Sequence, residues 1–221
     1  MRPVLVLRPE PGASATVERA RKRRLSATAI PLFEIESLAW EPPDAGGFDG
    51  LLLTSANAVR RGGDKLESLR ALPAYAVGEA TAGAAREAGF SIAATGNADV
   101  DRFLASIDPE LRLLHLCGAD RRSPEHPSQS ITPIIVYRAN PVEVPDLSSA
   151  KGAVALIHSP RAGHRFAELV RDRISTSIVA ISSAAAEAVG RGWQAVEVAD
   201  QPTDDALLAV AARLCNNPPP E

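Results

Sequence analysis

The sequence contains few of the residues that characterise several large classes of protein. It has only two cysteines, Cys117 and Cys215, which lie far apart and form neither a CxxC motif nor a metal-ligand spacing. We therefore expect two free thiols, as in a protein of a reducing compartment. The chain has only two Trp, two Tyr and five Phe, and its net charge is −3, which argues against binding of nucleic acids by stacking or by bulk electrostatics. No apolar run approaches the roughly 18 residues of a membrane-spanning helix.

The motifs of several cofactor-dependent and hydrolytic enzymes are missing as well. Arg8-Pro9-Glu10-Pro11-Gly12 follows the first predicted strand, where a dinucleotide-binding protein carries GxGxxG, and there is no GxxxxGK[ST] phosphate loop. The four histidines lack the HExxH spacing, and no serine lies in a GxSxG elbow. We therefore expect neither a cofactor nor a metal. The first residues are apolar for only four positions before Arg8, so we expect no secretion signal and a cytoplasmic protein.

Short apolar runs alternate with Ala-rich helical stretches along the 221 residues. The runs lack polar alternation, which is typical of strands that are covered on both faces in parallel sheets. A helix is predicted near Ala13–Arg24, after the first run. The predicted strands are Val4–Leu7, Gly50–Leu53, Ala74–Val77, Leu113–Leu116, Ala153–Ile157 and Ile178–Ile181.

Three sequence blocks occur twice at a constant offset of 104 residues. Three matches in one register indicate two similar α/β units. An earlier pair, Val4–Pro9 and Leu113–Gly118, extends the repeat toward the N-terminus. The three blocks pair Leu53–Ala58 with Ile157–Ala162, Ala76–Ala82 with Ala180–Ala186, and Asp99–Leu104 with Thr203–Leu208.

The repeat leaves two domain organisations open. Each copy could fold as its own domain, with a boundary near residue 109. Alternatively, the extended segments around Pro31 and Pro133 could cross between two lobes that are each built from both halves of the chain. Proline-rich loops after these segments favour linkers, and hence crossovers near 31–38 and 133–141.

Small polar and basic residues gather where the predicted strands end and the helices begin. In open parallel sheets, ligands bind outside the carboxyl ends of the strands, and helix N-termini there attract anions. The same residue types are preferred N-caps, so capping alone explains any single one of them equally well. For the whole set, a binding cleft formed by two lobes is the better interpretation. The set is Arg8, Thr54, Ser55, Asn57, Gly78, Thr81, Gly118, Arg121, Ser159, Arg161, Ser182 and Ser183.

Four further residues have a chemical and a structural interpretation. Tyr137 ends the second crossover segment; it could be a core residue with a hydrated hydroxyl, or a proton donor at the mouth of the cleft. His115 lies inside a predicted strand and is interpreted as a core histidine. Asp101 and Asp205 each precede an apolar stretch and are predicted to lie at helix N-termini.

The order and spacing of these pieces resemble the uroporphyrinogen-III synthase family. No single piece is specific, but together they run along nearly the whole chain. They are a first strand ending in Arg8-Pro9; Leu53-Thr54-Ser55-Ala56-Asn57-Ala58-Val59; Val77–Ala82 with Gly89; Gly118 followed by Arg121; Val136-Tyr137-Arg138; Ile157–Ala162; and Pro202-Thr203 leading into Ala206–Leu208.

The resemblance implies an α/β fold of two similar lobes, each a parallel sheet flanked by helices, joined by a two-stranded antiparallel crossover. Residues 1–35 and 142–221 would form the first lobe, and residues 36–141 the second. It implies a cofactor-free lyase of porphyrin and heme biosynthesis that cyclises hydroxymethylbilane, inverts ring D through a spiro intermediate and releases water. Tyr137 would donate the proton, and the twelve loop residues would hold the substrate's carboxylates. We expect a monomer with neither a nucleic-acid nor a membrane partner.

The chain departs from the family pattern at several positions. Ser182-Ser183-Ala184-Ala185 replaces a loop that often carries Gly and Thr, so Ala185 stands where Thr81 stands in the other half. Leu7 precedes Arg8 where Thr is common, and Arg60-Arg61-Gly62-Gly63 lacks an aromatic residue. These departures leave open a non-catalytic two-lobed binding protein, or a degenerate paralogue, for an acidic small molecule. A flavodoxin-like nucleotide or flavin binder is disfavoured by the missing phosphate loop and by the absence of clustered aromatics.

Overall fold

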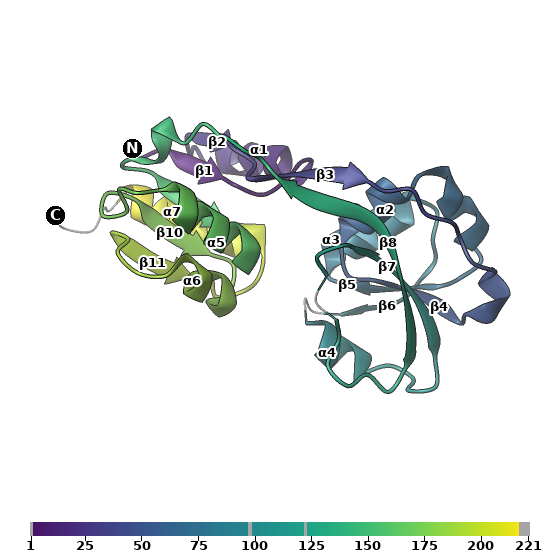
Figure 1. The fold of residues 1–221 in the computed structure, drawn as a ribbon. Helices are drawn as coiled ribbons and strands as arrows, with labels where there is room; N and C mark the ends of the chain where they lie inside the picture. Colours follow the sequence, from purple (N-terminus) through teal and green to yellow (C-terminus); the bar gives the residue numbers. More distant parts are fainter. Residues whose placement is uncertain (1, 97–98, 122, 217–221) are drawn as a thin grey trace. The chain divides into compact units, whose positions relative to one another are not determined.

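The computed structural model describes residues 2–96, 99–121 and 123–216. The chain divides into two compact units, each with its own sheet (Figure 1). Unit 1 ends at Glu34 and resumes at Pro141, and unit 2 spans Ile35–Asn140. Within these described ranges, no helix is long and apolar enough to cross a membrane.

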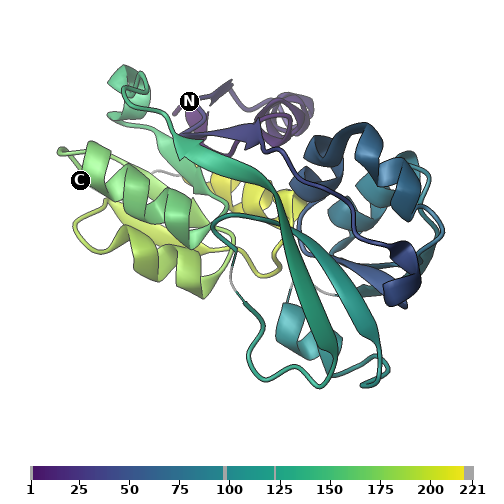
Figure 2. The ribbon, with the colours of Figure 1, turned by 45° about the vertical axis from the view of Figure 1, so that its right-hand side comes forward.

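Unit 1 is a five-stranded parallel sheet with the strand order β11-β10-β9-β1-β2. Helices α1 and α7 share one core cluster with the central strands, while α5 and α6 pack against each other (Figure 2). The strands are β1 (Val4–Val6), β2 (Ala27–Ala29), β9 (Val154–Ile157), β10 (Ser177–Ala180) and β11 (Ala195–Val198). The helices are α1 (Gly12–Lys22), α5 (Pro160–Leu169), α6 (Ser183–Val189) and α7 (Asp204–Asn216), with the short 3-10 helix η3 (Ser148–Ala150).

Unit 2 is a six-stranded sheet with the order β3-β8-β7-β4-β5-β6. Helices α2 and α3 share one core cluster, and α4 belongs to another. The strands are β3 (Phe33–Ser37), β4 (Gly50–Leu53), β5 (Ala74–Val77), β6 (Ile92–Gly96), β7 (Arg112–Gly118) and β8 (Ser130–Pro141). The helices are α2 (Ala56–Gly62), α3 (Glu79–Glu87) and α4 (Val100–Leu104), with the 3-10 helices η1 (Ala45–Gly47) and η2 (Gly63–Leu69).

The central strands are buried along their whole length, which explains their unbroken apolar sequences. Every residue of β1, β4, β9 and β10 is buried. The edge strand β11 instead alternates between half-buried and exposed residues. Helices on both faces leave no room for polar side chains on an inner strand, whereas an edge strand tolerates them.

Strand β8 changes partner along its length. Its first part pairs in parallel with β7. Farther along, the Leu38 N–H donates to the Val136 carbonyl, and the Val142 N–H donates to the Leu32 carbonyl. Residue numbers therefore rise on one strand as they fall on the other, so β3 and β8 are antiparallel. The Asn140 amide donates to Glu36 on β3 at 2.7 Å.

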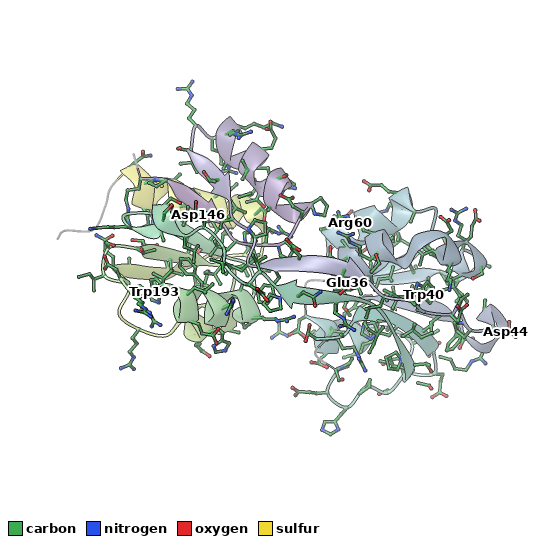
Figure 3. All side chains as sticks on the ribbon, turned by 45° about the horizontal axis from the view of Figure 1, so that its top comes forward. Glu36, Trp40, Asp44, Arg60, Asp146 and Trp193 are labelled. Atoms are coloured by element: carbon green, nitrogen blue, oxygen red, sulfur yellow. The ribbon has the colours of Figure 1, made fainter. Side chains whose placement is uncertain are left out.

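The two sheets repeat one topology. Read from one edge, β11-β10-β9-β1-β2 corresponds to β6-β5-β4-β7-β8, with β3 added outside β8. Each unit also has one tryptophan, Trp193 in unit 1 and Trp40 in unit 2 (Figure 3). Trp193 stacks on Phe166 with 5.3 Å between ring centroids, and the Trp40 indole donates to the Gly62 carbonyl. The predicted fold class, two similar α/β lobes with an antiparallel crossover, is confirmed. Both cysteines are free and buried.

Candidate functional site

The seven loop residues predicted for unit 2 lie at the carboxyl ends of three neighbouring strands. Because β5, β4 and β7 are adjacent and parallel, their carboxyl ends share one edge of the sheet. Two members of the set, Thr81 and Gly118, are buried, and the other five are half-buried. Thr54, Ser55 and Asn57 follow β4, Gly78 and Thr81 follow β5, and Gly118 ends β7 with Arg121 beyond it.

Ser55 caps helix α2 and also belongs to the candidate site. Its Oγ accepts a hydrogen bond from the Asn57 backbone N–H at 3.2 Å. A hydrogen bond also links the Ser55 side chain to Tyr137, and it lowers the pKa of the phenol against a larger effect of burial. Capping and participation in a site are therefore compatible at this position.

Tyr137 lies directly over Gly118. A β-bulge after Cys117 brings Tyr137 opposite Gly118 in the β7–β8 ladder, and the Ala119 N–H donates to the Tyr137 carbonyl at 2.9 Å. The phenol is half-buried, and burial raises its pKa above the usual value of about 10. The hydroxyl is consequently protonated at neutral pH, as a proton donor must be.

Thr54 is paired with the predicted core histidine. The Thr54 hydroxyl, just after β4, and His115 Nε2, on β7, lie 3.0 Å apart. His115 is 1% exposed, so its predicted core position is confirmed. Burial, helped by the charge of Arg121, lowers the pKa of His115 to about 4. The ring is therefore neutral near pH 7, with one nitrogen that donates and one that accepts.

Gly78 and Thr81 form the start of helix α3. Gly78 has φ +90°, in the region that favours glycine, and it precedes the first helical residue. The Thr81 N–H donates to the Gly78 carbonyl at 3.0 Å. Only 5% of Thr81 is exposed, so this hydroxyl is much less accessible to a ligand than those of Thr54 and Ser55.

The five residues predicted for unit 1 also lie at one edge of their sheet, just after the carboxyl ends of β1, β9 and β10. Arg8 follows β1, Ser159 and Arg161 follow β9, and Ser182 and Ser183 follow β10. Ser159 Oγ caps α5 by accepting from the Ala162 N–H at 3.2 Å. Ser182 Oγ caps α6 by accepting from the Ala185 N–H at 3.3 Å. The Arg161 guanidinium lies over the Phe33 ring, 4.4 Å from its centroid.

Sequence reasoning missed the polar cluster around Asp204 at this edge. Asp204 is the first residue of α7, and its carboxylate is 9% exposed. One oxygen accepts from Arg8 Nη1 at 3.0 Å and from His158 Nε2 at 3.1 Å. The other accepts from the Thr16 hydroxyl at 2.7 Å and from Arg19. Four donors on one carboxylate hold the Arg8 side chain in place.

The electrostatics of this cluster favour an ionised carboxylate. Burial alone would raise the pKa of Asp204, but hydrogen bonds from His158 and Thr16 and the charge of Arg8 outweigh it and lower the pKa. Burial also lowers the pKa of His158, against the opposing hydrogen bond to Asp204. The carboxylate can only accept, so His158 Nε2 carries a proton toward it.

A departure from the repeat could have indicated Asp204. The second copy has Asp204 where the first has Val100, while Asp205 and Asp101 correspond. Asp101 and Asp205 lie in the first turns of α4 and α7, as predicted. Asp204 is a carboxylate that the first copy of the repeat lacks, which indicates a contact present in unit 1 only. Its partners, however, could not be identified from the pattern.

The donors at these two edges suit anions. Both edges offer hydroxyl groups, arginine side chains and the backbone N–H groups of helix N-termini. Among the described residues, no group of three or more His, Cys, Asp and Glu could hold a metal ion. The prediction of a ligand cleft that both units line stays a prediction.

Comparisons with known proteins identify the family. The family model described as uroporphyrinogen-III synthase HemD matches residues 14–209. No match was found among curated proteins. The chain is similar to the crystal structure of uroporphyrinogen-III synthetase from Helicobacter pylori, with a TM-score of 0.68, 18% identity, and coverage of 97% of this chain and 100% of that one. It is also similar to a mutant uroporphyrinogen III synthase from the extremely thermophilic bacterium Thermus thermophilus, with a TM-score of 0.55, 16% identity, and coverage of 98% and 100%. The chain thus belongs to the uroporphyrinogen-III synthase family, which points to porphyrin and heme biosynthesis.

Proposed function

We propose that this protein is a uroporphyrinogen-III synthase, a cofactor-free lyase that cyclises hydroxymethylbilane with inversion of ring D and loss of water. The observation that carries the proposal is the family match over residues 14–209. The half-buried phenol of Tyr137 at the carboxyl edge of unit 2 supports it, because the reaction needs a proton donor there. We expect the enzyme to act as a cytoplasmic monomer.

In the proposed mechanism, Tyr137 donates its proton to the terminal hydroxyl of ring A. The C–O bond breaks, water leaves, and the electron pair of the pyrrole nitrogen forms an azafulvene. The substituted carbon of ring D attacks the exocyclic methylene carbon of the azafulvene and gives a spiro intermediate. This intermediate fragments to a second azafulvene and recombines at the free α-carbon of ring D. Loss of the proton from that carbon gives the type III isomer and balances the proton that Tyr137 donated. Because the same substrate closes without inversion in the absence of enzyme, catalysis is mainly control of geometry.

The substrate's eight carboxylates would be held by the loop donors of both units. Thr54, Ser55 and Asn57 would contribute from unit 2, and Arg8, Ser159 and Arg161 from unit 1. Each serine oxygen that caps a helix still has its own proton to donate, so capping does not consume the hydroxyl. Many modest donors suit a ligand with many carboxylates.

An isomer assay tests the proposal. Purified protein is mixed with freshly prepared hydroxymethylbilane, the products are oxidised, and the type I and type III uroporphyrins are separated by chromatography. We expect an excess of type III. Only type I, formed at the rate measured without protein, would refute the synthase function.

The second candidate is a non-catalytic binding protein for an acidic small molecule. The start of α6 favours it, because Ser182-Ser183-Ala184-Ala185 replaces the pattern of Gly78 and Thr81 in unit 2. Such a protein would bind hydroxymethylbilane without raising the yield of type III. Tight binding in a titration together with type I product alone would support this candidate over the synthase.

A further inference from the structure

Because Gly118 has no side chain, there is room beside it for the Tyr137 hydroxyl. A Cβ atom at position 118 would lie 2.6 Å from Tyr137 Cζ, 2.8 Å from Cε2 and 2.9 Å from the hydroxyl oxygen. These distances are far below ordinary van der Waals contact, so the ring could not stay where it is. The atoms that would collide belong to the hydroxyl end of the ring. Any side chain at position 118 would therefore move the phenol oxygen itself.

The β-bulge opposite Gly118 places the Tyr137 ring over this glycine. Cys117 pairs with Ile135 and Gly118 pairs with Tyr137, so Val136 is the extra residue of a bulge. Bulges of this kind redirect a side chain relative to the regular ladder. The ring then covers the glycine across the strands, with Ser55 as a hydrogen-bonding partner. Gly118 has no positive φ, so space and not backbone conformation makes glycine necessary here.

We propose that Gly118 is a positioning residue for the Tyr137 phenol, and that it acts by lacking a side chain. The sequence interpretation gave Gly118 a direct role in holding substrate; here it acts through Tyr137. The inference rests on the proposed function for its catalytic part, since only a synthase needs the phenol as a proton donor. Its structural part concerns the free protein and can be tested without substrate.

The tyrosine content makes the structural part directly observable. The chain has only Tyr75 and Tyr137, so protein labelled with 13C at tyrosine Cζ gives two NMR signals, and Tyr75→Phe assigns them. We expect Gly118→Ala to shift the Tyr137 signal and to leave the Tyr75 signal in place. Gly50→Ala is a control for the other ring, because a Cβ there would lie 2.6 Å from Tyr75 Cε2, besides 2.9 Å from the Pro73 carbonyl oxygen, and should shift the other signal. Gly83→Ala meets nothing within 4 Å and should shift neither.

Kinetics test the catalytic part. We expect Gly118→Ala to lower kcat for type III formation at least tenfold with little change in KM. In a Tyr137→Phe background the same substitution should add less than a twofold loss, because the hydroxyl that it displaces is already absent. An equal loss in both backgrounds, or a rise in KM alone, would overturn the positioning role.

A failure of Gly118→Ala to fold can be distinguished from a failure of the proposed function. If Gly118→Ala does not fold, the double variant Gly118→Ala/Tyr137→Ala should fold again, because the ring that collides is gone. Failure of that rescue would contradict the steric argument. An unmoved Tyr137 signal in folded Gly118→Ala would overturn the inference whatever the activity. Wild-type protein that makes no type III would refute the proposed function and the catalytic part, while the NMR result would still decide the structural part.

Discussion

Arg8 and Asp204 lie 196 positions apart in the chain and form an ion pair of 3.0 Å within unit 1. Thr16, Arg19 and His158 donate to the same carboxylate. The contact ties the loop after β1 to the start of α7, which come from opposite ends of the sequence. A residue expected to bind substrate is thus oriented by a carboxylate from the last helix.

We expect Asp204→Asn to destabilise the protein by roughly 1–3 kcal/mol. Both carboxylate oxygens accept from two donors, so the amide NH2 of asparagine would face donors on one side. Asp205→Asn is the matched control, because the neighbouring carboxylate is 73% exposed, and we expect a change within about 0.5 kcal/mol. Urea unfolding of wild type and of the two variants at pH 7 measures both changes in the free energy of unfolding. Equal stabilities of the two variants would contradict the importance of the cluster.

The difference between wild type and Asp204→Asn should depend on pH. The folded-state pKa of Asp204 lies below its unfolded value of about 4, so the ionised form stabilises the folded state. This stabilisation is fully present above about pH 5 and is lost as the pH falls toward the folded-state pKa. The difference in unfolding free energy should therefore narrow progressively from about pH 5 to pH 3. A constant difference across this range would mean that the charge of Asp204 is not responsible.

His115 should make the protein less stable in mild acid. Its folded-state pKa of about 4 lies below the unfolded value of about 6.5, so the neutral ring is favoured in the fold. The stabilisation is complete above about pH 6.5 and is lost as the pH falls toward 4. Relative to His115→Gln, which cannot titrate there, the unfolding constant of wild type should rise up to about 50-fold between pH 7 and 4.5. Parallel pH profiles of the two proteins would rule this out.

Tyr137→Phe should lower kcat for type III formation by about 10²-fold or more, with nearly unchanged binding of the tetrapyrrole. The variant removes only the proton-donating hydroxyl and keeps the ring that covers Gly118. Tyr75→Phe, on strand β5 of the same sheet, is the control and should keep full activity. Turnover and substrate affinity are measured separately. Unchanged turnover in Tyr137→Phe would remove this residue from the mechanism.

Arg161 should bind substrate through its charge. We expect Arg161→Ala to weaken substrate binding more at low salt than at high salt, because screening reduces the attraction to carboxylates. Arg161→Lys should keep most of the binding, and Arg171→Ala, at an exposed position after α5, should have no effect. Titrations at two salt concentrations compare the four proteins. A loss that does not depend on salt would point instead to the packing of Arg161 on Phe33.

Local patterns predicted much of the fold because each buried strand, and each helix that follows one, is encoded by a run of consecutive residues. Gly50–Leu53 and Ala74–Val77 are strands with the predicted bounds, and their apolar runs reflect burial on both faces. The short edge strands Ala27–Ala29 and Ala195–Val198 were not predicted. An edge strand is half exposed, so its sequence does not require an apolar run.

The two α/β repeats, the polar loops after the strands and the family resemblance follow from residue order and spacing alone. The pairs of residues that meet follow from the folded chain: Asp204 with Arg8, Thr54 with His115, and Tyr137 with Gly118. Each pair joins segments that are distant in sequence or lie on different strands. Such contacts depend on strand order and on the bulge after Cys117, which no local periodicity encodes.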